Sequence, residues 1–145
     1  MAADGWHRLS PLDAAFLYFE RPTQRLHVGC VALLDGPVPF EPFAALLAER
    51  LGRLGRYRQR PVRPTFDLDW PSWEDDAAFD VRRHVRHVAV PPPGGEHELH
   101  ELVDTLFSMP FDRRHPLWEF YLIEGLADGR AAVLSKVHHC MIDGV

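Results

Sequence analysis

Two apolar runs near the C-terminal end constrain the fold of this chain most. Leu117–Glu124 and Ala131–Val137 flank Asp128-Gly129, a residue pair that tight β-hairpin turns favour. The second run is apolar on both faces apart from Ser135 and Lys136, which is typical of a strand buried inside a sheet. The sequence therefore predicts a β-hairpin whose return strand is central in a sheet.

The return strand leads directly into residues suited to proton transfer. His138 and His139 follow it, and after three more residues come Asp143 and Gly144. The pKa of histidine lies near neutral pH, so an imidazole held at a strand end can take a proton from an attacking hydroxyl group. An aspartate four positions later can close the loop, and glycine allows backbone angles that larger residues avoid. The same spacing also fits a structural histidine followed by an Asp-Gly turn.

Periodicity and capping signals predict the other regular elements. Ser10-Pro11-Leu12-Asp13 is typical of a helix start, with serine as N-cap and proline in the first turn. Alternation or apolar character predicts strands over His27–Leu34 and the second half of Val81–Val90. Helical spacing predicts two longer helices, one over Pro39–Arg53 and one carrying Leu99, Leu102, Val103, Leu106 and Phe107.

Two stretches between these elements carry weak signals. Arg56–Pro64 is basic and interrupted by prolines, so a solvated loop is expected there. Asp67–Asp80 mixes acids with large aromatic residues and suggests an irregular connection. Its two tryptophans, Trp70 and Trp73, are expected to cap the core, with lining of an acyl pocket as the alternative.

Size and charge limit the function classes. A chain of 145 residues is long enough for one domain with a hydrophobic core. A net charge of -5 and a pI near 6.0 argue against nucleic acid as a partner. Two cysteines favour a reducing, cytoplasmic compartment over a disulfide scaffold. The sequence shows no signal peptide and no apolar run of membrane-spanning length, and peripheral contact with a membrane stays open.

Three other groups of residues are candidate sites with simpler interpretations. Cys140 is adjacent to His139, but neighbours in an extended segment point to opposite faces, so a small buried cysteine is favoured over a nucleophile. The remaining histidine pairs lack a third metal ligand at a sensible spacing, so a solvated helix face is expected for each, and no metal site. These pairs are His97 with His100 and His84 with His87.

The motif His138-His139-x-x-x-Asp143-Gly144 resembles the active site of acyl-CoA-dependent acyltransferases with the chloramphenicol-acetyltransferase-like fold. The closer resemblance is to bacterial wax ester synthase/diacylglycerol acyltransferases. Three further collinear segments are similar to that family. They are Leu9–Leu17, His27-Val28-Gly29, and the stretch from Pro110-Phe111-Asp112-Arg113 through Pro116-Leu117-Trp118-Glu119 to Ile123-Glu124-Gly125-Leu126.

The resemblance implies a role for each matching residue. His139 matches the catalytic histidine, the general base toward the acceptor hydroxyl, and His138 matches its supporting neighbour. Asp143 matches a mainly structural residue and Gly144 the loop glycine. Cys140 stands where the family more often has a small apolar residue. The residues that match a site-shaping motif are Pro116, Leu117 and Trp118.

The resemblance also implies substrates and architecture. The donor would be a long-chain acyl-CoA and the acceptor diacylglycerol or a long-chain alcohol, with no metal or bound cofactor. The expected fold is α/β, an α+β sandwich half: a mixed β-sheet with helices packed on one face and the histidines at a strand end facing an open edge. Residues 1–145 would form the N-terminal acyltransferase domain of a two-domain enzyme, without the C-terminal domain.

Partners and rival functions follow from this architecture. The candidate partners are a separate C-terminal half, a second copy of the chain, and a membrane or lipid-droplet surface. Half a substrate tunnel excludes little water, so little or no activity is expected of the isolated chain. Two alternatives remain: a non-catalytic remnant or interaction module of the same fold, and a condensation-type domain that uses carrier-protein thioesters.

Overall fold

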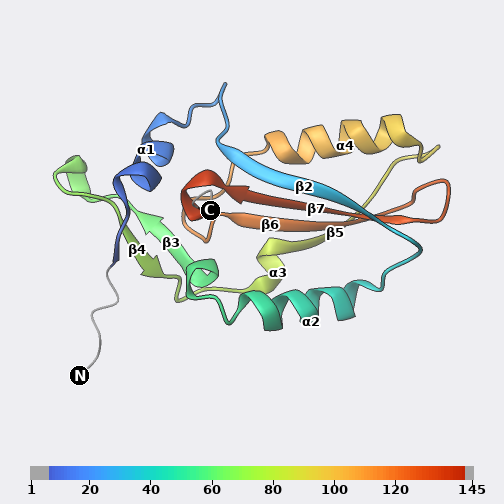
Figure 1. Cartoon of the computed structure of the whole chain (residues 1–145), viewed down its shortest axis with the longest axis horizontal. Helices are drawn as coiled ribbons and strands as arrows, with labels where there is room; N and C mark the ends of the chain where they lie inside the picture. Colours follow the sequence, from blue (N-terminus) through green and yellow to red (C-terminus); the bar gives the residue numbers. More distant parts are fainter. Residues whose placement is uncertain (1–6, 143–145) are drawn as a thin grey trace.

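The computed structural model describes residues 7–142, which form two β-sheets and their covering helices (Figure 1). Within these residues no helix has both the length and the apolar character needed to cross a membrane. The strands are β1 (His7–Arg8), β2 (His27–Leu34), β3 (Gln59–Val62), β4 (Ser72–Asp75), β5 (Val85–Ala89), β6 (Trp118–Glu124) and β7 (Ala131–His138). The α-helices are α1 (Pro11–Phe19), α2 (Phe40–Leu51), α3 (Val81–His84) and α4 (Glu96–Ser108). Short 3₁₀ turns cover Gly55–Arg58, Thr65–Asp67 and His139–Met141.

The larger sheet has the strand order β2-β7-β6-β5. Strand β7 pairs antiparallel with both β2 and β6, whereas β5 and β6 run parallel, so the sheet is mixed. The predicted hairpin is present, with Gly129 at φ +78°, and its return strand is central as expected. The pairing of β2 with β7 places His27 opposite His138 at one end of the sheet.

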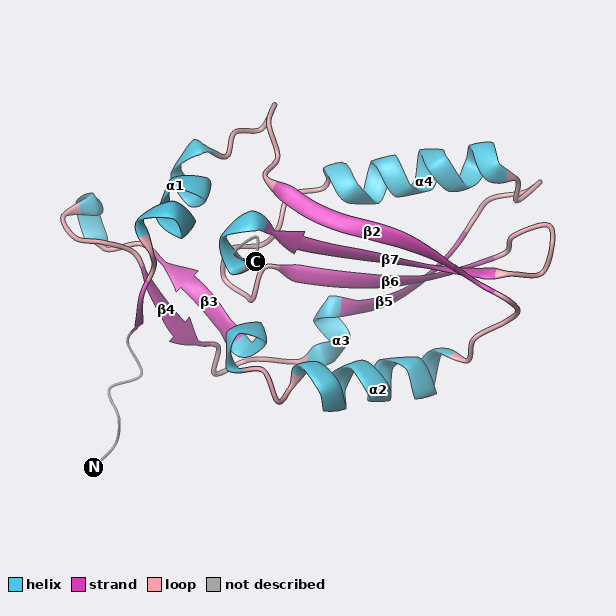
Figure 2. Ribbon diagram, in the orientation of Figure 1, coloured by secondary structure: helices cyan, strands magenta, loops and turns pink. Residues whose placement is uncertain are grey.

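The helices cover both faces of this sheet, which corrects the expectation of one covered face (Figure 2). Helix α4 packs on the face that carries Tyr121 and Ile123, and α2 packs toward the opposite face with Trp118 and Val85. The reason is visible in β6, which presents apolar side chains alternately to both faces. A strand of that kind leaves apolar surface exposed unless both faces are covered.

The predicted helix start and the first strand are both confirmed. The Ser10 hydroxyl accepts a hydrogen bond from the Asp13 backbone N–H at 3.1 Å, as an N-cap does. Strand β2 has the predicted bounds. A side chain at Gly29 would collide with the Ser135 carbonyl oxygen of β7, so this glycine permits the close approach of the two strands.

The stretches expected to be irregular instead contribute a second sheet, of order β1-β4-β3. Pro61 is buried in β3 opposite Trp73 of β4, so the solvated loop expected over Arg56–Pro64 is wrong. Proline is tolerated there because β3 is an edge strand and needs fewer backbone donors. The side chain of Trp73 is 1% exposed and belongs to the core, as expected, whereas Trp70 is half exposed.

Candidate active site

The backbone at the end of β7 is anchored on both sides. The His138 N–H donates to the Leu117 carbonyl oxygen at 2.9 Å, and the His139 N–H donates to the Leu26 carbonyl oxygen at 2.8 Å. One partner precedes β6 and the other precedes β2, the two strands that flank β7. The chain then turns into the 3₁₀ segment His139–Met141. The two histidines therefore sit on a fixed piece of backbone.

The side chain of His138 is fully buried, with Nδ1 hydrogen-bonded and Nε2 close to a carboxylate without a hydrogen bond. Nδ1 accepts a hydrogen bond from the Cys140 backbone N–H at 3.1 Å, which places the ring proton on Nε2. Nε2 lies 3.5 Å from Oε2 of Glu20. Burial lowers the pKa of His138 to about 4, although the charge of Glu20 acts in the opposite direction. At neutral pH this residue is thus a neutral part of the framework.

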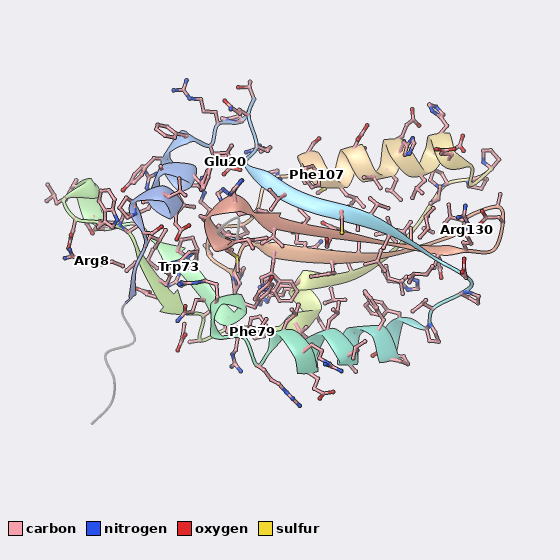
Figure 3. All side chains as sticks on the ribbon, in the orientation of Figure 1. Arg8, Glu20, Trp73, Phe79, Phe107 and Arg130 are labelled. Carbon is pink, nitrogen blue, oxygen red and sulfur yellow. The ribbon has the colours of Figure 1, made fainter. Side chains whose placement is uncertain are left out.

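Glu20, which directly follows α1 and is labelled in Figure 3, contacts several elements through its buried carboxylate. Oε2 accepts a hydrogen bond from Nη2 of Arg113 at 2.7 Å, and Oε1 lies 3.2 Å from Nε2 of His27. Nδ1 of His27 donates to the Phe107 carbonyl oxygen at 2.9 Å. Burial would raise the pKa of Glu20, but the hydrogen bond and charge of Arg113, with the interactions of His138 and His27, outweigh it and lower the pKa. An ionised Glu20 thus pairs with Arg113 of the loop before β6 and lies beside His138 of β7 and His27 of β2.

His139 differs from its neighbour because its ring nitrogens are uncommitted. It is half buried, and its ring stacks on Phe16 of α1 with centroids 4.0 Å apart and an angle of 22° between the planes. Within residues 7–142, neither Nδ1 nor Nε2 makes a hydrogen bond, and Nδ1 is buried. Helix α1 covers this end of β7, so the expected open edge is corrected: His138 is enclosed and only His139 is partly accessible.

The residues of the site-shaping motif are all buried beside the histidines. Pro116 and Leu117 precede β6, and Leu117 acts through its carbonyl oxygen as described above. The indole N–H of Trp118 donates to the Tyr57 carbonyl oxygen at 2.8 Å, and its ring stacks on His84 with centroids 4.5 Å apart. The motif thus fixes the position of the end of β7 within the core.

Burial and ion pairing decide between the interpretations of Cys140 and of the pair His97 and His100. Cys140 is a free, buried thiol whose pKa is raised by burial, which disfavours a nucleophilic thiolate. His97 and His100 are exposed and lie near Glu101 and Glu96 along α4, as expected of a solvated helix face. The described residues contain no cluster of three or more side chains that could hold a metal ion.

The expectation for the other histidine pair is partly wrong. His84 is buried, and its Nδ1 donates to the Trp118 carbonyl oxygen at 2.9 Å. His87 lies on β5, stacks on Phe40 with centroids 5.0 Å apart and pairs with Glu124. The two residues do not share a helix face because α3 ends at His84 and a strand begins directly after it.

Asp143 and Gly144 lie outside the described residues, so their expected roles stay predictions. The structure adds site residues that the motif did not indicate, namely Phe16, Glu20 and Arg113. Phe16 and Arg113 belong to segments that carry the family resemblance. No sequence signal marked Glu20, because a glutamate after a short helix is ordinarily solvated.

We expect the stability of the fold to fall in mild acid. Burial lowers the pKa of His27, His84 and His138, and for His138 the shift is from 6.5 to about 4. Between these values the unfolded chain binds protons that the folded chain does not, so the free energy of unfolding decreases as the pH falls. Urea unfolding curves recorded across this interval measure the effect.

Two variants separate this effect from the general titration of carboxylates. His97→Asn removes an exposed histidine and should keep the full decrease, whereas His138→Gln should show a smaller one. A free energy of unfolding that stays constant or rises as the pH falls through this interval would refute the assignment of these histidines as neutral groups.

The sequence profile described as the wax ester synthase/diacylglycerol acyltransferase catalytic domain matches residues 9–145. A Mycobacterium tuberculosis protein named "probable diacylglycerol O-acyltransferase" is 45% identical over 142 residues, which are 96% of this chain and 31% of that protein. A second M. tuberculosis protein with the same descriptive name is 39% identical over 141 residues, 95% of this chain and 52% of its own length. The chain thus spans only part of these relatives.

Solved structures agree with the sequence matches. The wax ester synthase/diacylglycerol acyltransferase of Marinobacter aquaeolei VT8 superposes with a TM-score of 0.77 at 35% identity, over 95% of this chain and 35% of that one. The first condensation domain of the calcium-dependent antibiotic synthetase gives 0.75 at 19% identity, over 96% of this chain and 34% of that one, a likeness of fold alone. The expected α/β fold with a mixed sheet is confirmed. The chain therefore belongs to the wax ester synthase/diacylglycerol acyltransferase catalytic-domain family.

Proposed function

We propose that this chain supplies the histidine-bearing domain of an O-acyltransferase. The enzyme moves a long-chain fatty acyl group from acyl-CoA to diacylglycerol or a long-chain alcohol. The acceptor oxygen attacks the thioester carbonyl, the new ester bond forms, and the carbon–sulfur bond to coenzyme A breaks. The hydroxyl proton must be removed during the attack and delivered to the departing thiolate. Family membership and the names of the relatives support this reaction class.

One contrast within the histidine pair carries the proposal. The His138 ring is enclosed, and its Nδ1 can accept a proton only by losing the hydrogen bond from the Cys140 N–H. The ring nitrogens of His139 make no hydrogen bond to the described residues, while its stacking on Phe16 fixes the ring plane. His139 is the general base and His138 its support. Asp143 and Gly144 shape the following loop, and Pro116, Leu117 and Trp118 shape the wall behind it.

The chain is the N-terminal domain of this enzyme and carries one wall of its substrate channel. It spans about a third of the first M. tuberculosis protein and of the Marinobacter protein, which leaves room in them for a further domain. A general base gains most when water is excluded and surrounding dipoles are fixed, and a second wall supplies that exclusion. The two free cysteines, Cys30 and Cys140, are consistent with a cytoplasmic setting.

We expect the isolated chain to turn over weakly or not at all. The measurement is acyl transfer from palmitoyl-CoA to dioleoylglycerol or hexadecanol, by the chain alone and by a chimera. In the chimera the chain replaces the matching 31% of the M. tuberculosis relative. Turnover by the chimera alone supports the proposal of a shared site. Turnover by the isolated chain at the rate of the chimera would contradict it.

A condensation-type reaction with carrier-protein thioesters has less support. The condensation domains resemble this chain at 14–19% identity, whereas acyltransferases of the family reach 35–45%. Replacement of palmitoyl-CoA by a palmitoyl carrier protein in the chimera assay distinguishes the two donors.

A further inference from the structure

Strand β2 is an edge strand that leaves apolar side chains in water. Within the described residues it pairs with β7 alone, and in Figure 1 it is the outermost strand of the larger sheet. Five consecutive residues, Gly29–Leu33, are exposed, with Val31 and Leu33 at 41% and 47%. A long apolar edge of this kind is a template on which another strand can pair.

The other edge strands in the described part of the chain carry features that discourage such pairing. Strand β5 has Arg86 and His87 among its five residues, β3 contains Pro61, and β1 is two residues long. Strand β2 has eight residues, His27–Leu34, without a lysine, an arginine, a carboxylate or a proline. Because charges, proline and short length protect an edge, β2 is the unprotected one among them.

The hydrogen bonds to β7 and to the residue after it show which backbone groups of β2 point outward. The Leu26 carbonyl oxygen accepts from the His139 N–H at 2.8 Å. The Cys30 N–H donates to the Ser135 hydroxyl at 3.3 Å, and the Cys30 carbonyl oxygen lies 3.5 Å from the same hydroxyl. Backbone groups alternate in direction along a strand, so even-numbered residues face β7 and odd-numbered residues face outward. The outward set is His27, Gly29, Val31 and Leu33.

Opposite charges stand at the two ends of β2. Arg25 lies two residues before the strand and Asp35 directly follows it. Neither forms a hydrogen bond or an ion pair with the described residues, and Nε of Arg25 is buried without a partner. An antiparallel strand of the same sequence would bring its own Asp35 to this Arg25, and its own Arg25 to this Asp35. The edge is therefore complementary to itself.

We infer that two copies of this chain associate through their β2 strands, antiparallel and about a two-fold axis at Cys30. The outward residues then form hydrogen-bonded pairs between the copies, Gly29 with Val31 and His27 with Leu33. Val31 meets a glycine, so its branched side chain fits without a clash. The two Cys30 residues face each other at a position without backbone hydrogen bonds, where Cα atoms lie about 4.5 Å apart. The contact uses the same surface on both copies.

The register follows from the backbone and from the charges together. A shift by one residue would set inward-facing groups of one strand against outward-facing groups of the other. A shift by two would place an outward residue of each strand opposite a residue beyond the strand, and would separate Arg25 from Asp35. In the inferred register Val31 and Leu33 form one apolar stripe across the axis, and its burial is favourable. The inference goes beyond the proposed function and does not depend on acyl transfer.

Sedimentation equilibrium of the full chain at increasing concentration measures the association, and a monomer–dimer equilibrium is expected. Val31→Lys/Leu33→Lys should weaken the dimer by about a hundredfold or more, because charged groups replace the apolar stripe. The matched control is Leu46→Lys/Leu54→Lys, at two leucines that are each 50% exposed elsewhere on the molecule. That control should dimerise like the unaltered chain. All four substituted side chains are well exposed, so both variants should keep the circular dichroism spectrum of the unaltered chain.

The charges have a test of their own. Arg25→Glu and Asp35→Arg each set like charges against one another at both ends of their own dimers, so each should self-associate about tenfold more weakly. An equimolar mixture of the two variants re-forms both attractive pairs and should dimerise like the unaltered chain. Damage to the fold by either substitution would not be repaired by mixing, so recovery is specific to this pairing.

Cys30 reports the register. Diamide oxidises two facing thiols to a disulfide and is itself reduced, so the unaltered chain should form a cross-linked dimer. Cys140→Ser should keep the cross-link, because that thiol is buried. Cys30→Ser/Ala32→Cys moves the thiol two positions along the same face of β2 and should cross-link much more slowly.

Three results would overturn the inference: a chain that stays monomeric at about 100 μM, a Val31→Lys/Leu33→Lys variant that associates as well as the unaltered chain, or equal cross-linking through positions 30 and 32. Protection of Cys30 from maleimide in a monomeric chimera would also overturn it, by assigning the edge to the added part of the relative.

Discussion

Replacement of His139 by alanine is expected to lower kcat for acyl transfer by about 10²–10⁴-fold in the chimera that turns over palmitoyl-CoA. The imidazole nitrogens are uncommitted within the described residues, so their loss removes the base without breaking an internal hydrogen bond. The KM for palmitoyl-CoA should change little, because the ring takes part in proton transfer more than in binding the donor.

His97→Ala is the matched control, since this histidine is exposed on α4. Its turnover should equal that of the unaltered chimera. A His139→Ala chimera that keeps more than about a tenth of the original kcat would lie outside the range expected for loss of a general base.

The second large effect concerns the stability of the fold. Lys136 lies near the C-terminal end of β7 with its side chain fully buried, and Nζ donates to the carbonyl oxygens of Leu106 and Met109 at 3.0 and 2.6 Å. It also donates to Oε2 of Glu119 at 3.2 Å. The ammonium group thus closes the C-terminal end of α4 and neutralises a carboxylate. Burial lowers the pKa of Lys136, and Glu119 acts in the opposite direction.

Lys136→Met should lower the free energy of unfolding by about 3–5 kcal/mol, because the largely buried Glu119 carboxylate loses its cationic partner. Urea unfolding monitored by tryptophan fluorescence measures the change. The double variant Lys136→Met/Glu119→Gln should recover part of the loss, and Arg130→Met at an exposed pair with Asp128 should change stability much less. A Lys136→Met chain as stable as the unaltered one would contradict the role of this ion pair.

The elements with strong local signals were predictable from the sequence. The hairpin around Gly129, the serine cap of α1 and the apolar face of α4 each rest on neighbouring residues. The second sheet was not predictable, because β3 contains Pro61 and depends on pairing with a strand about ten residues further on. The cover on the second face of the larger sheet likewise depends on tertiary packing.

The candidate site likewise combines features that the sequence predicted with features that it did not. The motif predicted the place of His138 and His139 at a strand end, and the structure confirms it. It did not indicate that one ring would be enclosed and the other partly accessible. That difference arises from Glu20 and Phe16, which approach from α1 more than a hundred residues earlier in the chain. Buried partners of this kind come from folding and leave no local pattern.

The division of roles between the two histidines is tested most directly by measuring turnover and stability on His138→Gln and His139→Gln chimeras. We predict that His139→Gln abolishes most turnover and leaves the free energy of unfolding nearly unchanged. His138→Gln should lower the free energy of unfolding, because the Cys140 N–H and Glu20 lose a buried partner. Full turnover in the His139→Gln chimera, with activity lost only in a stably folded His138→Gln chimera, would contradict the account.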